Sequence, residues 1–129
     1  MKLRYRWMEK RDFDKINSNN KLDLKKSLKN KKVVANIVEW EDNIFGWIFY
    51  EIFNKKIKIT KIAFVEKEIL NFILENLFKK NKTIEISISE YDLKMQLALK
   101  ENGFLFVESI KNNDIYYYKF RKENGPQRA

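Results

Sequence analysis

Residues 56–89 read KIKITKIAFVEKEILNFILENLFKKNKTIEISIS, and this stretch decides the fold. Its first part alternates apolar and charged residues and then becomes continuously apolar, which is typical of a strand buried on both faces at its end. From Glu66 to Lys80 the apolar residues recur at helical spacing. Ile84, Ile86 and Ile88 then alternate again. A strand, a helix and a second strand in this order predict a crossover with locally parallel pairing.

The segment before this unit is rich in strand patterns. We expect a first strand at Leu3–Met8, followed by a short helix that Asp12 caps and that carries Phe13 and Ile16. A second short helix is expected at 21–30. Two further strands, at 33–40 and 44–53, would form a meander with the strand that ends at Val65. Gly46, within the second of them, indicates a bulge or a close backbone approach.

After the crossover unit, Asp92 is placed to cap a helix that runs to Asn102, and Gly103 is placed to end it. Strands are expected at 104–110 and 115–120. The whole pattern predicts one α+β domain over residues 1–120, with a mixed central sheet of about seven strands and four helices. Residues 121–129 hold the only proline and few apolar side chains, so we expect a flexible tail.

Composition excludes several functions. The chain has 129 residues, with neither cysteine nor histidine, which excludes thiol chemistry, histidine triads and the common zinc sites. The net charge is +9, and 22 of the 27 basic residues are lysine. Because isoleucine and asparagine are also abundant, part of this charge reflects the codon bias of an AT-rich genome. No stretch predicts a membrane span or a signal peptide, so we expect a cytoplasmic protein.

Four segments carry a resemblance to a known family: RWMEKRD at 6–12, IFGWIFYE at 44–51, KITKIAFV at 58–65 and QLALKENGF at 96–104. Together, in this order and over residues 3–120, they resemble the GNAT N-acetyltransferases. Within that superfamily they resemble the ribosomal-protein-alanine N-acetyltransferases, the RimI-like branch. The resemblance implies a GNAT (acyl-CoA N-acyltransferase) fold. It also implies acetyl-CoA as cofactor and a protein or peptide amine as acceptor.

The expected acetyl-CoA site departs from the family pattern. The resemblance places Ile62, Ala63, Phe64 and Val65 along the pantetheine arm, although simple core burial is the preferred interpretation of these four residues. Family members hold the pyrophosphate in a glycine-rich loop that opens the next helix. Here the chain has no glycine between Gly46 and Gly103. Lys67 is the only cation in the expected loop, and Glu66 and Glu68 flank it, so the loop is predicted to be deleted.

The catalytic positions depart as well. The family's carboxylate base corresponds to Ser87, and the family's tyrosine acid corresponds to Leu99, which cannot donate a proton. Asp92 stands where the family has an asparagine, and because aspartate is a favoured N-cap residue, a purely structural role as a helix cap is a strong alternative. Replacement donors from Tyr116–Tyr118 or from Glu39, Glu41 and Glu51 are less favoured than ordinary strand packing.

We therefore predict a GNAT-fold protein that has lost standard acetyl-CoA binding and catalysis and acts as a binding or regulatory module. The alternative is an active N-acetyltransferase with a rebuilt loop, which would use acetyl-CoA; otherwise no cofactor is expected. A small-molecule sensor is a third hypothesis. A protein or peptide partner is expected, and the lysine clusters allow nucleic acid or the ribosome. A homodimer through the last strand, 115–120, is also considered.

Overall fold

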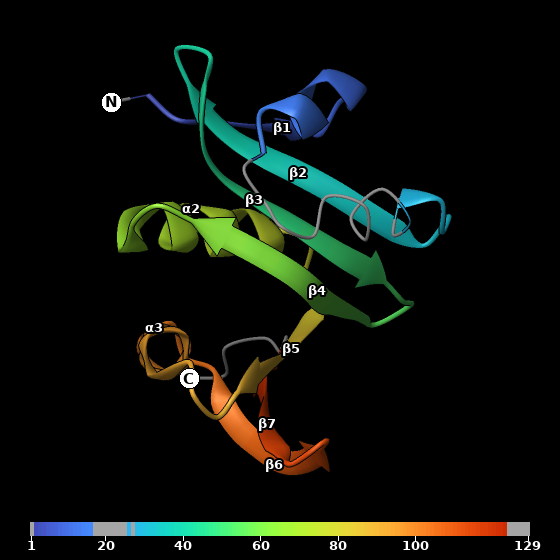
Figure 1. The fold of residues 1–129 in the computed structure, drawn as a ribbon, viewed down its shortest axis with the longest axis vertical. Helices are drawn as coiled ribbons and strands as arrows, with labels where there is room; N and C mark the ends of the chain where they lie inside the picture. The colour runs from blue at the N-terminus through green and yellow to red at the C-terminus, as the bar shows by residue number, and fades with distance from the viewer. Residues whose placement is uncertain (1, 17–25, 27, 124–129) are drawn as a thin grey trace.

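The computed structural model describes residues 2–16, 26, 28–123 of the chain. Seven strands form one mixed sheet in the order β1-β2-β3-β4-β5-β7-β6 (Figure 1). The strands are β1 (Arg4–Trp7), β2 (Val33–Trp40), β3 (Asn43–Ile52), β4 (Lys56–Phe64), β5 (Thr83–Ser89), β6 (Leu105–Asn112) and β7 (Ile115–Lys122). The helices are the 3₁₀ helix η1 (Lys10–Asp14) and the α-helices α2 (Lys67–Phe78) and α3 (Leu93–Glu101). The α+β class and the seven-stranded sheet are confirmed.

Local sequence signals explain the turns and the end of α3. The hairpin between β2 and β3 turns at Glu41 and Asp42, whose φ angles are 48° and 67°, and this left-handed pair matches the twist of the flanking strands. The Asp92 carboxylate accepts a hydrogen bond from the Met95 amide at 3.1 Å, as the sequence predicted. Gly103 follows α3 with φ 88°, which confirms it as the residue that ends the helix.

The two faces of the sheet carry separate apolar clusters. On one face, α2 buries Ile69, Leu70, Ile73, Leu74 and Leu77 in a large core that also includes the inward side chains of α3. On the other face, η1 covers a smaller cluster made by Phe13, Ile16, Ala35 and Phe49. The chain is therefore built in layers around β2, β3 and β4, with the helix-covered core on one side and η1 on the other.

The parallel strands β4 and β5 form a fork, which means that they pair at their amino-terminal ends and then separate. β4 and β5 pair only over four residues each, from Lys56 with Thr83 to Ile59 with Ile86. β4 then continues to Phe64 and β5 to Ser89 without further pairing to each other. Figure 1 shows the two strands diverging toward their carboxyl ends. The crossover and the fork agree with the strand–helix–strand prediction.

Gly46 lies where α2 presses against β3. A Cβ atom at this position would come within 2.7 Å of the Ile69 Cγ2 and 3.0 Å of the Ala63 carbonyl oxygen. Both distances are shorter than ordinary contacts, so a larger residue would push α2 away from the sheet. The close approach predicted from the sequence is confirmed.

Two predictions need correction, and a third lies mostly outside the described residues. Asp12 does not cap the first helix: Glu9 is the residue before η1, and Asp12 lies within η1 and accepts a hydrogen bond from the Glu9 amide at 2.7 Å. Two α-helices and one 3₁₀ helix are complete among the described residues, and the fourth helix, expected at 21–30, falls mostly outside them, with residues 26 and 28 helical. β7 runs to Lys122, so the expected tail begins later than 121, and most of it lies outside the described residues.

Candidate functional site

A cavity of about 220 Å³ lies beside the carboxyl end of β4, on the η1 side of the sheet. Its walls are the start of β3 (Ile44–Trp47) and the end of β4 with the residue after it (Ala63–Val65). Lys15 and Ile16, directly after η1, complete the lining. The cavity is therefore mostly apolar, with one lysine among its lining residues. Such a site fits an apolar group that lies next to a negative charge.

The four residues expected along a pantetheine arm have different surroundings. Ile62 and Phe64 are only partly buried and pack against the main core, and Phe64 also lines the cavity. Ala63 and Val65 line the cavity on the other side, and Val65 is 67% exposed. The prediction that these residues are buried in the core is therefore wrong for Val65. The end of β4 offers a ligand one apolar wall.

The junction between β4 and α2 is only Val65 and Glu66. Glu66 occupies the N-cap position of α2 in an extended conformation, and Glu68 lies in the first turn. Lys67 forms a solvent-exposed ion pair with Glu101 of α3, which competes with a phosphate for its ammonium group. A phosphate approaching this helix end would meet two exposed carboxylates and no glycine-lined backbone cradle.

The two positions that correspond to the family's acid and base are not brought together. Ser87 is exposed and lies on the face of β5 opposite Ile86 and Ile88, away from α2 and α3. Leu99 is completely buried in the main core. Asp92 uses its carboxylate to cap α3. Among the described residues, these three positions therefore provide no acid–base pair.

A polar pocket of about 170 Å³ surrounds Ser87 instead. Its floor is the buried carboxylate of Glu85, which Arg121 contacts through Nε at 2.8 Å and Nη2 at 2.6 Å, and which Lys56 contacts at 3.3 Å. Burial raises the pKa of Glu85, but hydrogen bonds from Arg121 and Lys56 outweigh burial and leave the pKa below its usual value. Glu85 is therefore ionised, and Arg121 and Lys56 each contact one of its carboxylate oxygens.

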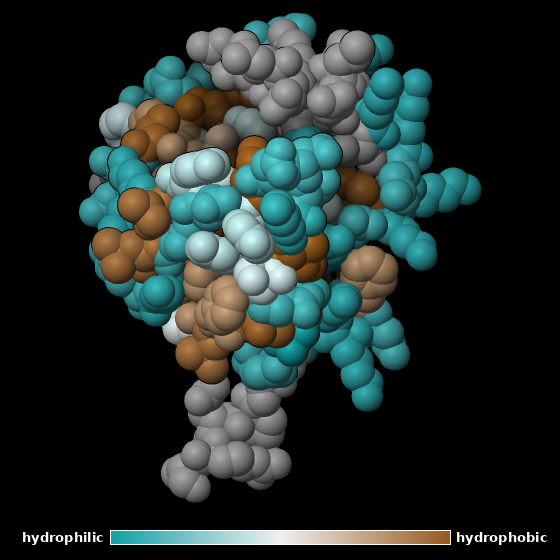
Figure 2. Space-filling view, turned by 60° about the horizontal axis from the view of Figure 1, so that its bottom comes forward, coloured by the Kyte–Doolittle hydropathy of each residue, from teal (hydrophilic) through white to brown (hydrophobic). Residues whose placement is uncertain are grey.

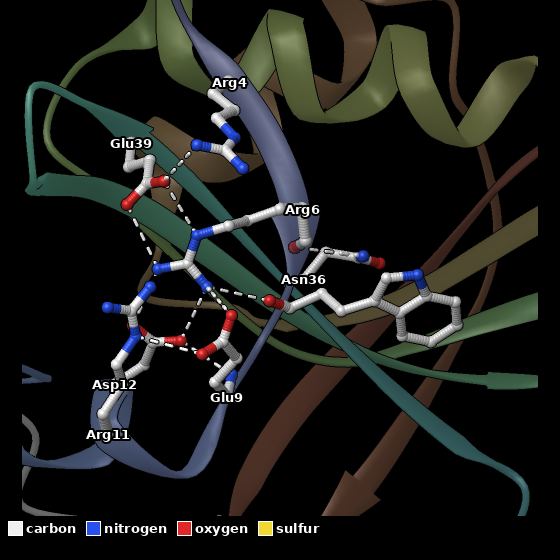
Figure 3. Close-up of polar contacts among 8 residues, drawn as sticks. Arg4, Arg6, Glu9, Arg11, Asp12, Asn36 and Glu39 are labelled. Atoms are coloured by element: carbon white, nitrogen blue, oxygen red, sulfur yellow. Dashed lines mark hydrogen bonds and ion pairs between the residues drawn. The ribbon is translucent and has the colours of Figure 1, made fainter.

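Sequence reasoning missed the strongest polar cluster, which Figure 3 draws around Arg6. The guanidinium contacts the Asp12 carboxylate with two bonds of 2.8 Å and the Glu39 carboxylate with bonds of 2.8 and 3.1 Å. Hydrogen bonds from Arg6 are the main cause that holds the pKa values of Asp12 and Glu39 below their usual range. A signal was available, because Arg6 stands between Tyr5 and Trp7 in a strand and Asp12 follows in the next turn.

The Arg6 cluster positions one wall of the cavity. It joins β1, η1 and β2 through a single cation, and Asp12 itself is completely buried. Because Lys15 and Ile16 directly follow η1, the ion pairs fix their position over the sheet. Glu39, considered as a replacement base in the sequence, is instead committed to this structural role.

Within residues 2–16, 26 and 28–123, no three histidine, cysteine or acidic side chains are grouped closely enough to hold a metal ion. In the same part of the chain, no helix combines the length and apolar character needed to cross a bilayer.

Comparisons with solved structures identify the architecture. A GNAT-family acetyltransferase from Bacillus cereus ATCC 10987 superposes with TM-score 0.77 at 16% identity, covering 98% of this chain and all of the other. The ribosomal-protein-S18-alanine N-acetyltransferase from Escherichia coli gives TM-score 0.77 at 7% identity, with 97% and 96% coverage. The chain has the GNAT fold. No protein-family model matches the sequence, and the search of curated proteins finds no match.

A third GNAT structure extends the comparison to another substrate. Mutant forms of the spermidine/spermine N-acetyltransferase SpeG from Vibrio cholerae superpose with TM-score 0.73 at 16% identity, covering 94% of each chain. Neighbours with such different acceptors share the GNAT fold, so the fold does not choose the substrate. In this GNAT fold the fork and the end of β4 are present, and the junction before α2 is acidic and short.

Proposed function

We propose that this protein is a GNAT-fold binding module of RimI-like descent that does not hold acetyl-CoA in the family's manner. The observation that carries the proposal is the junction between β4 and α2. Two residues connect the elements, carboxylates stand at the N-cap and in the first turn, and Lys67 is paired with Glu101. Each carboxylate near the pyrophosphate position opposes binding by on the order of 1 kcal/mol.

The ligand class follows from the cavity at the end of β4. Its mostly apolar lining suits one apolar side chain, and Lys15, the lysine among its lining residues, suits a neighbouring carboxylate. The protein as a whole is basic, which also favours an acidic partner. We infer a peptide segment of a cytoplasmic protein partner, in which an apolar residue lies next to an acidic one.

A peptide is favoured over nucleic acid by the apolar lining of the cavity, and four of the 22 lysines have partners within the fold. Lys56, Lys67 and Lys119 form ion pairs with Glu85, Glu101 and Glu108. Lys82 donates to the carbonyl oxygens of Phe53 and Asn54. These four lysines are therefore less available for phosphate contacts, and the net charge of +9, in which their acidic partners are already counted, remains for an acidic partner.

The first experiment is calorimetric titration of CoA and acetyl-CoA into the protein at low salt. We expect no heat and no thermal shift at millimolar ligand. The double variant Glu66→Lys/Glu68→Lys reverses the charge of the junction and provides the matched comparison, with weak CoA binding as its expected result. Saturable binding of acetyl-CoA to the unmodified protein at micromolar concentration would contradict the proposal.

The second experiment tests the peptide ligand. Trp47 lines the cavity, so its fluorescence reports occupancy when short peptides carrying Leu-Glu or Leu-Lys pairs are titrated. Ala63→Leu fills part of the cavity and is expected to weaken binding of the Leu-Glu peptide about tenfold. Equal binding of both peptides, or stronger binding of an oligoribonucleotide, would refute the assignment of an acidic apolar peptide.

An active N-acetyltransferase is the second candidate, because the fork between β4 and β5 is present. In this case a peptide amine would attack the thioester carbonyl, the new C–N bond would replace the C–S bond, and the thiolate of CoA would leave. Mass spectrometry of peptides incubated with acetyl-CoA distinguishes the two candidates. A time-dependent gain of an acetyl group, proportional to protein concentration, would favour the enzyme.

A further inference from the structure

The positive charge of this protein is concentrated at one end of the sheet. The amino ends of β2, β4 and β5 and the carboxyl ends of β3 and β7 meet at this end, as the registers of these strands require. The segments that flank these strand ends contain ten lysine or arginine residues and one acidic residue, so their formal charge equals the +9 of the whole chain. These segments are 29–32, 53–56, 79–82 and 121–123.

The opposite end, where the fork opens, has the reverse charge. The segments that connect strands and helices there contain seven acidic residues and one lysine; they are 41–43, 66–68, 90–92 and 112–114. In Figure 2, which keeps the left and right sides of Figure 1, long hydrophilic side chains project on the right, where β4 begins. An acidic partner is therefore attracted to the amino end of β4 and repelled from its carboxyl end.

The cavity lies at the carboxyl end of β4, and the η1 side of this strand connects it to the basic end. Ala63, which lines the cavity, pairs with Trp47, and Lys61 pairs with Phe49. Cross-strand partners share a face of the sheet, and Phe49 belongs to the η1-side cluster, so Lys61 is on that side. Lys58 is on the same side, because its two neighbours in β4 are buried in the main core.

The cavity and the two lysines are evenly spaced along the sheet. The partners of Ala63, Lys61 and Lys58 on β3 stand at positions 47, 49 and 51, because a register shift absorbs the extra residue in β4. Two residues of an extended chain span about 6.7 Å, and alternate side chains share a face. An extended peptide with its first side chain in the cavity therefore brings its third side chain to Lys61 and its fifth to Lys58.

Both lysines are available to a ligand. Lys58 is exposed and Lys61 is half-buried, and neither ammonium group has an ion pair or hydrogen bond with another described residue. The other lysines near this path are already paired: Lys56 lies 3.3 Å from the carboxylate of Glu85, and Lys119 lies 3.4 Å from that of Glu108. Among the described residues, Lys58 and Lys61 are therefore the cations of this path that an added carboxylate can contact without displacing a partner.

An acidic polypeptide fits this path better than nucleic acid. The path begins in a mostly apolar cavity, which a phosphate group does not fill. All exposed aromatic side chains of the described residues lie outside β4, so nucleobases have no stacking platform along it. Glu51 pairs with Lys58 across the strands, and Glu85 lines the neighbouring polar pocket. These two carboxylates oppose a continuous row of phosphates, whereas a peptide can space its charges.

We propose that the acidic partner presents an extended segment whose apolar residue enters the cavity and whose third and fifth residues, counted from it, are acidic and contact Lys61 and Lys58. This proposal rests on the proposed function, since it uses the same cavity, and it adds the length, charge spacing and direction of the ligand. With the carboxylate that suits Lys15, the pattern is apolar–acidic–acidic–any–acidic. Each exposed ion pair contributes about two- to fivefold in affinity, so the two added pairs contribute about tenfold.

The first test compares two peptides of the same composition, Leu-Glu-Glu-Ala-Glu-Ala and Leu-Glu-Ala-Glu-Ala-Glu, with blocked termini. Extended, only the first directs its added carboxylates toward the sheet. Both, and both reversed sequences, are titrated into the whole chain at low salt with Trp47 fluorescence as readout. We expect about tenfold tighter binding of the first pattern in one chain direction, and a smaller difference in high salt.

The outcomes separate this proposal from the proposed function. Equal affinity of the two patterns in both chain directions, with the short Leu-Glu peptide still bound, would overturn the proposal and leave the cavity assignment standing. No binding of any of these peptides would overturn both. Tighter binding of a six-nucleotide oligoribonucleotide than of the first pattern would replace the acidic segment with a phosphate backbone.

The second test removes the two lysines. Lys58→Met/Lys61→Met should reduce the preference between the two peptides to less than twofold and leave the affinity for the short Leu-Glu peptide unchanged. Lys94→Met/Lys100→Met is the matched control, because it removes the same charge from exposed positions of α3, on the other side of the sheet. Circular dichroism checks that both variants fold. Equal weakening by both variants would mean that only net charge matters, which would overturn the proposal.

A charge exchange tests direct contact at one position. Lys61→Glu should weaken binding of Leu-Glu-Glu-Ala-Glu-Ala and favour Leu-Glu-Lys-Ala-Glu-Ala, in the chain direction found in the first test. The four affinities form a double-mutant cycle, for which we expect a coupling of at least threefold. An additive cycle would place the third side chain of the peptide away from Lys61 and overturn the proposed spacing.

Discussion

The two halves of the sheet bury carboxylates on the same face but neutralise them in opposite ways. In the N-terminal half, one cation, Arg6, contacts the carboxylates of Asp12 and Glu39. In the C-terminal half, two cations, Arg121 and Lys56, contact one carboxylate, that of Glu85. A shared cation leaves two buried charges when it is removed, whereas either of two cations can be lost while the other remains. The first cluster should therefore be far more sensitive to substitution.

The largest expected effect is that of Arg6→Met. Removing the guanidinium leaves Asp12, which is completely buried, and Glu39 without their main partner. The free energy of unfolding should fall by about 3–5 kcal/mol, as for other broken buried ion pairs. Urea denaturation followed by circular dichroism measures the loss. Arg4→Met is the matched control, because Arg4 is exposed and 3.8 Å from Glu39, and it should cost less than about 1 kcal/mol.

Acid should weaken the native state through the same three carboxylates. The pKa values of Asp12, Glu39 and Glu85 are lower in the folded chain than usual, so the stability that they contribute is present at neutral pH. It is lost as pH falls through the folded values, below about pH 4. Melting curves between pH 7 and pH 2.5 should show this fall. A melting temperature that stays constant down to pH 2.5 would argue against the lowered values.

Arg121→Met should have an intermediate effect. The arginine makes two short contacts to Glu85, but it is about one-third exposed and Lys56 remains in place. We expect a loss of about 1–2 kcal/mol in the free energy of unfolding. A loss as large as that of Arg6→Met would remove the distinction between the two clusters.

The smallest expected effect is that of Lys56→Met. Its ammonium lies 3.3 Å from Glu85 and its side chain is 44% exposed. Solvent already screens this charge, and Arg121 continues to neutralise the carboxylate, so the loss should stay below about 1 kcal/mol. The double variant Arg121→Met/Lys56→Met sharpens the comparison, since it should lose more than the sum of the single changes.

Local signals made most of the fold predictable. The alternation of isoleucines in β5, the helical spacing in α2 and the turn residues around α3 each act within a few residues of the chain. The edge position of β6 was not predictable in this way, because the exposure of a strand depends on which strands flank it. Its composition resembles that of a half-buried strand, yet all eight residues are exposed.

The candidate site was only partly predictable. The acidic junction before α2 could be read directly from Glu66 and Glu68, because helix ends have local sequence signals. The cavity beside β4 could not, since it brings together residues 15–16, 44–47 and 63–65, which are distant in the sequence. The shared role of Arg6 was harder to predict, because its second carboxylate, Glu39, lies on β2, which meets β1 only in the folded sheet.

Because of the fork between β4 and β5, the middle of the sheet contains backbone amides that are weakly protected against hydrogen exchange. Beyond Ile59, the backbone groups of β4 that point toward β5 have no ladder partner in β5. Their amide hydrogens should exchange with solvent deuterium faster than those of the same strand that face β3. Protection in this molecule should therefore not decline smoothly from the centre of the sheet to its edges, and a ligand that fills the fork should slow the exchange of these amides more than that of any other part of the strand.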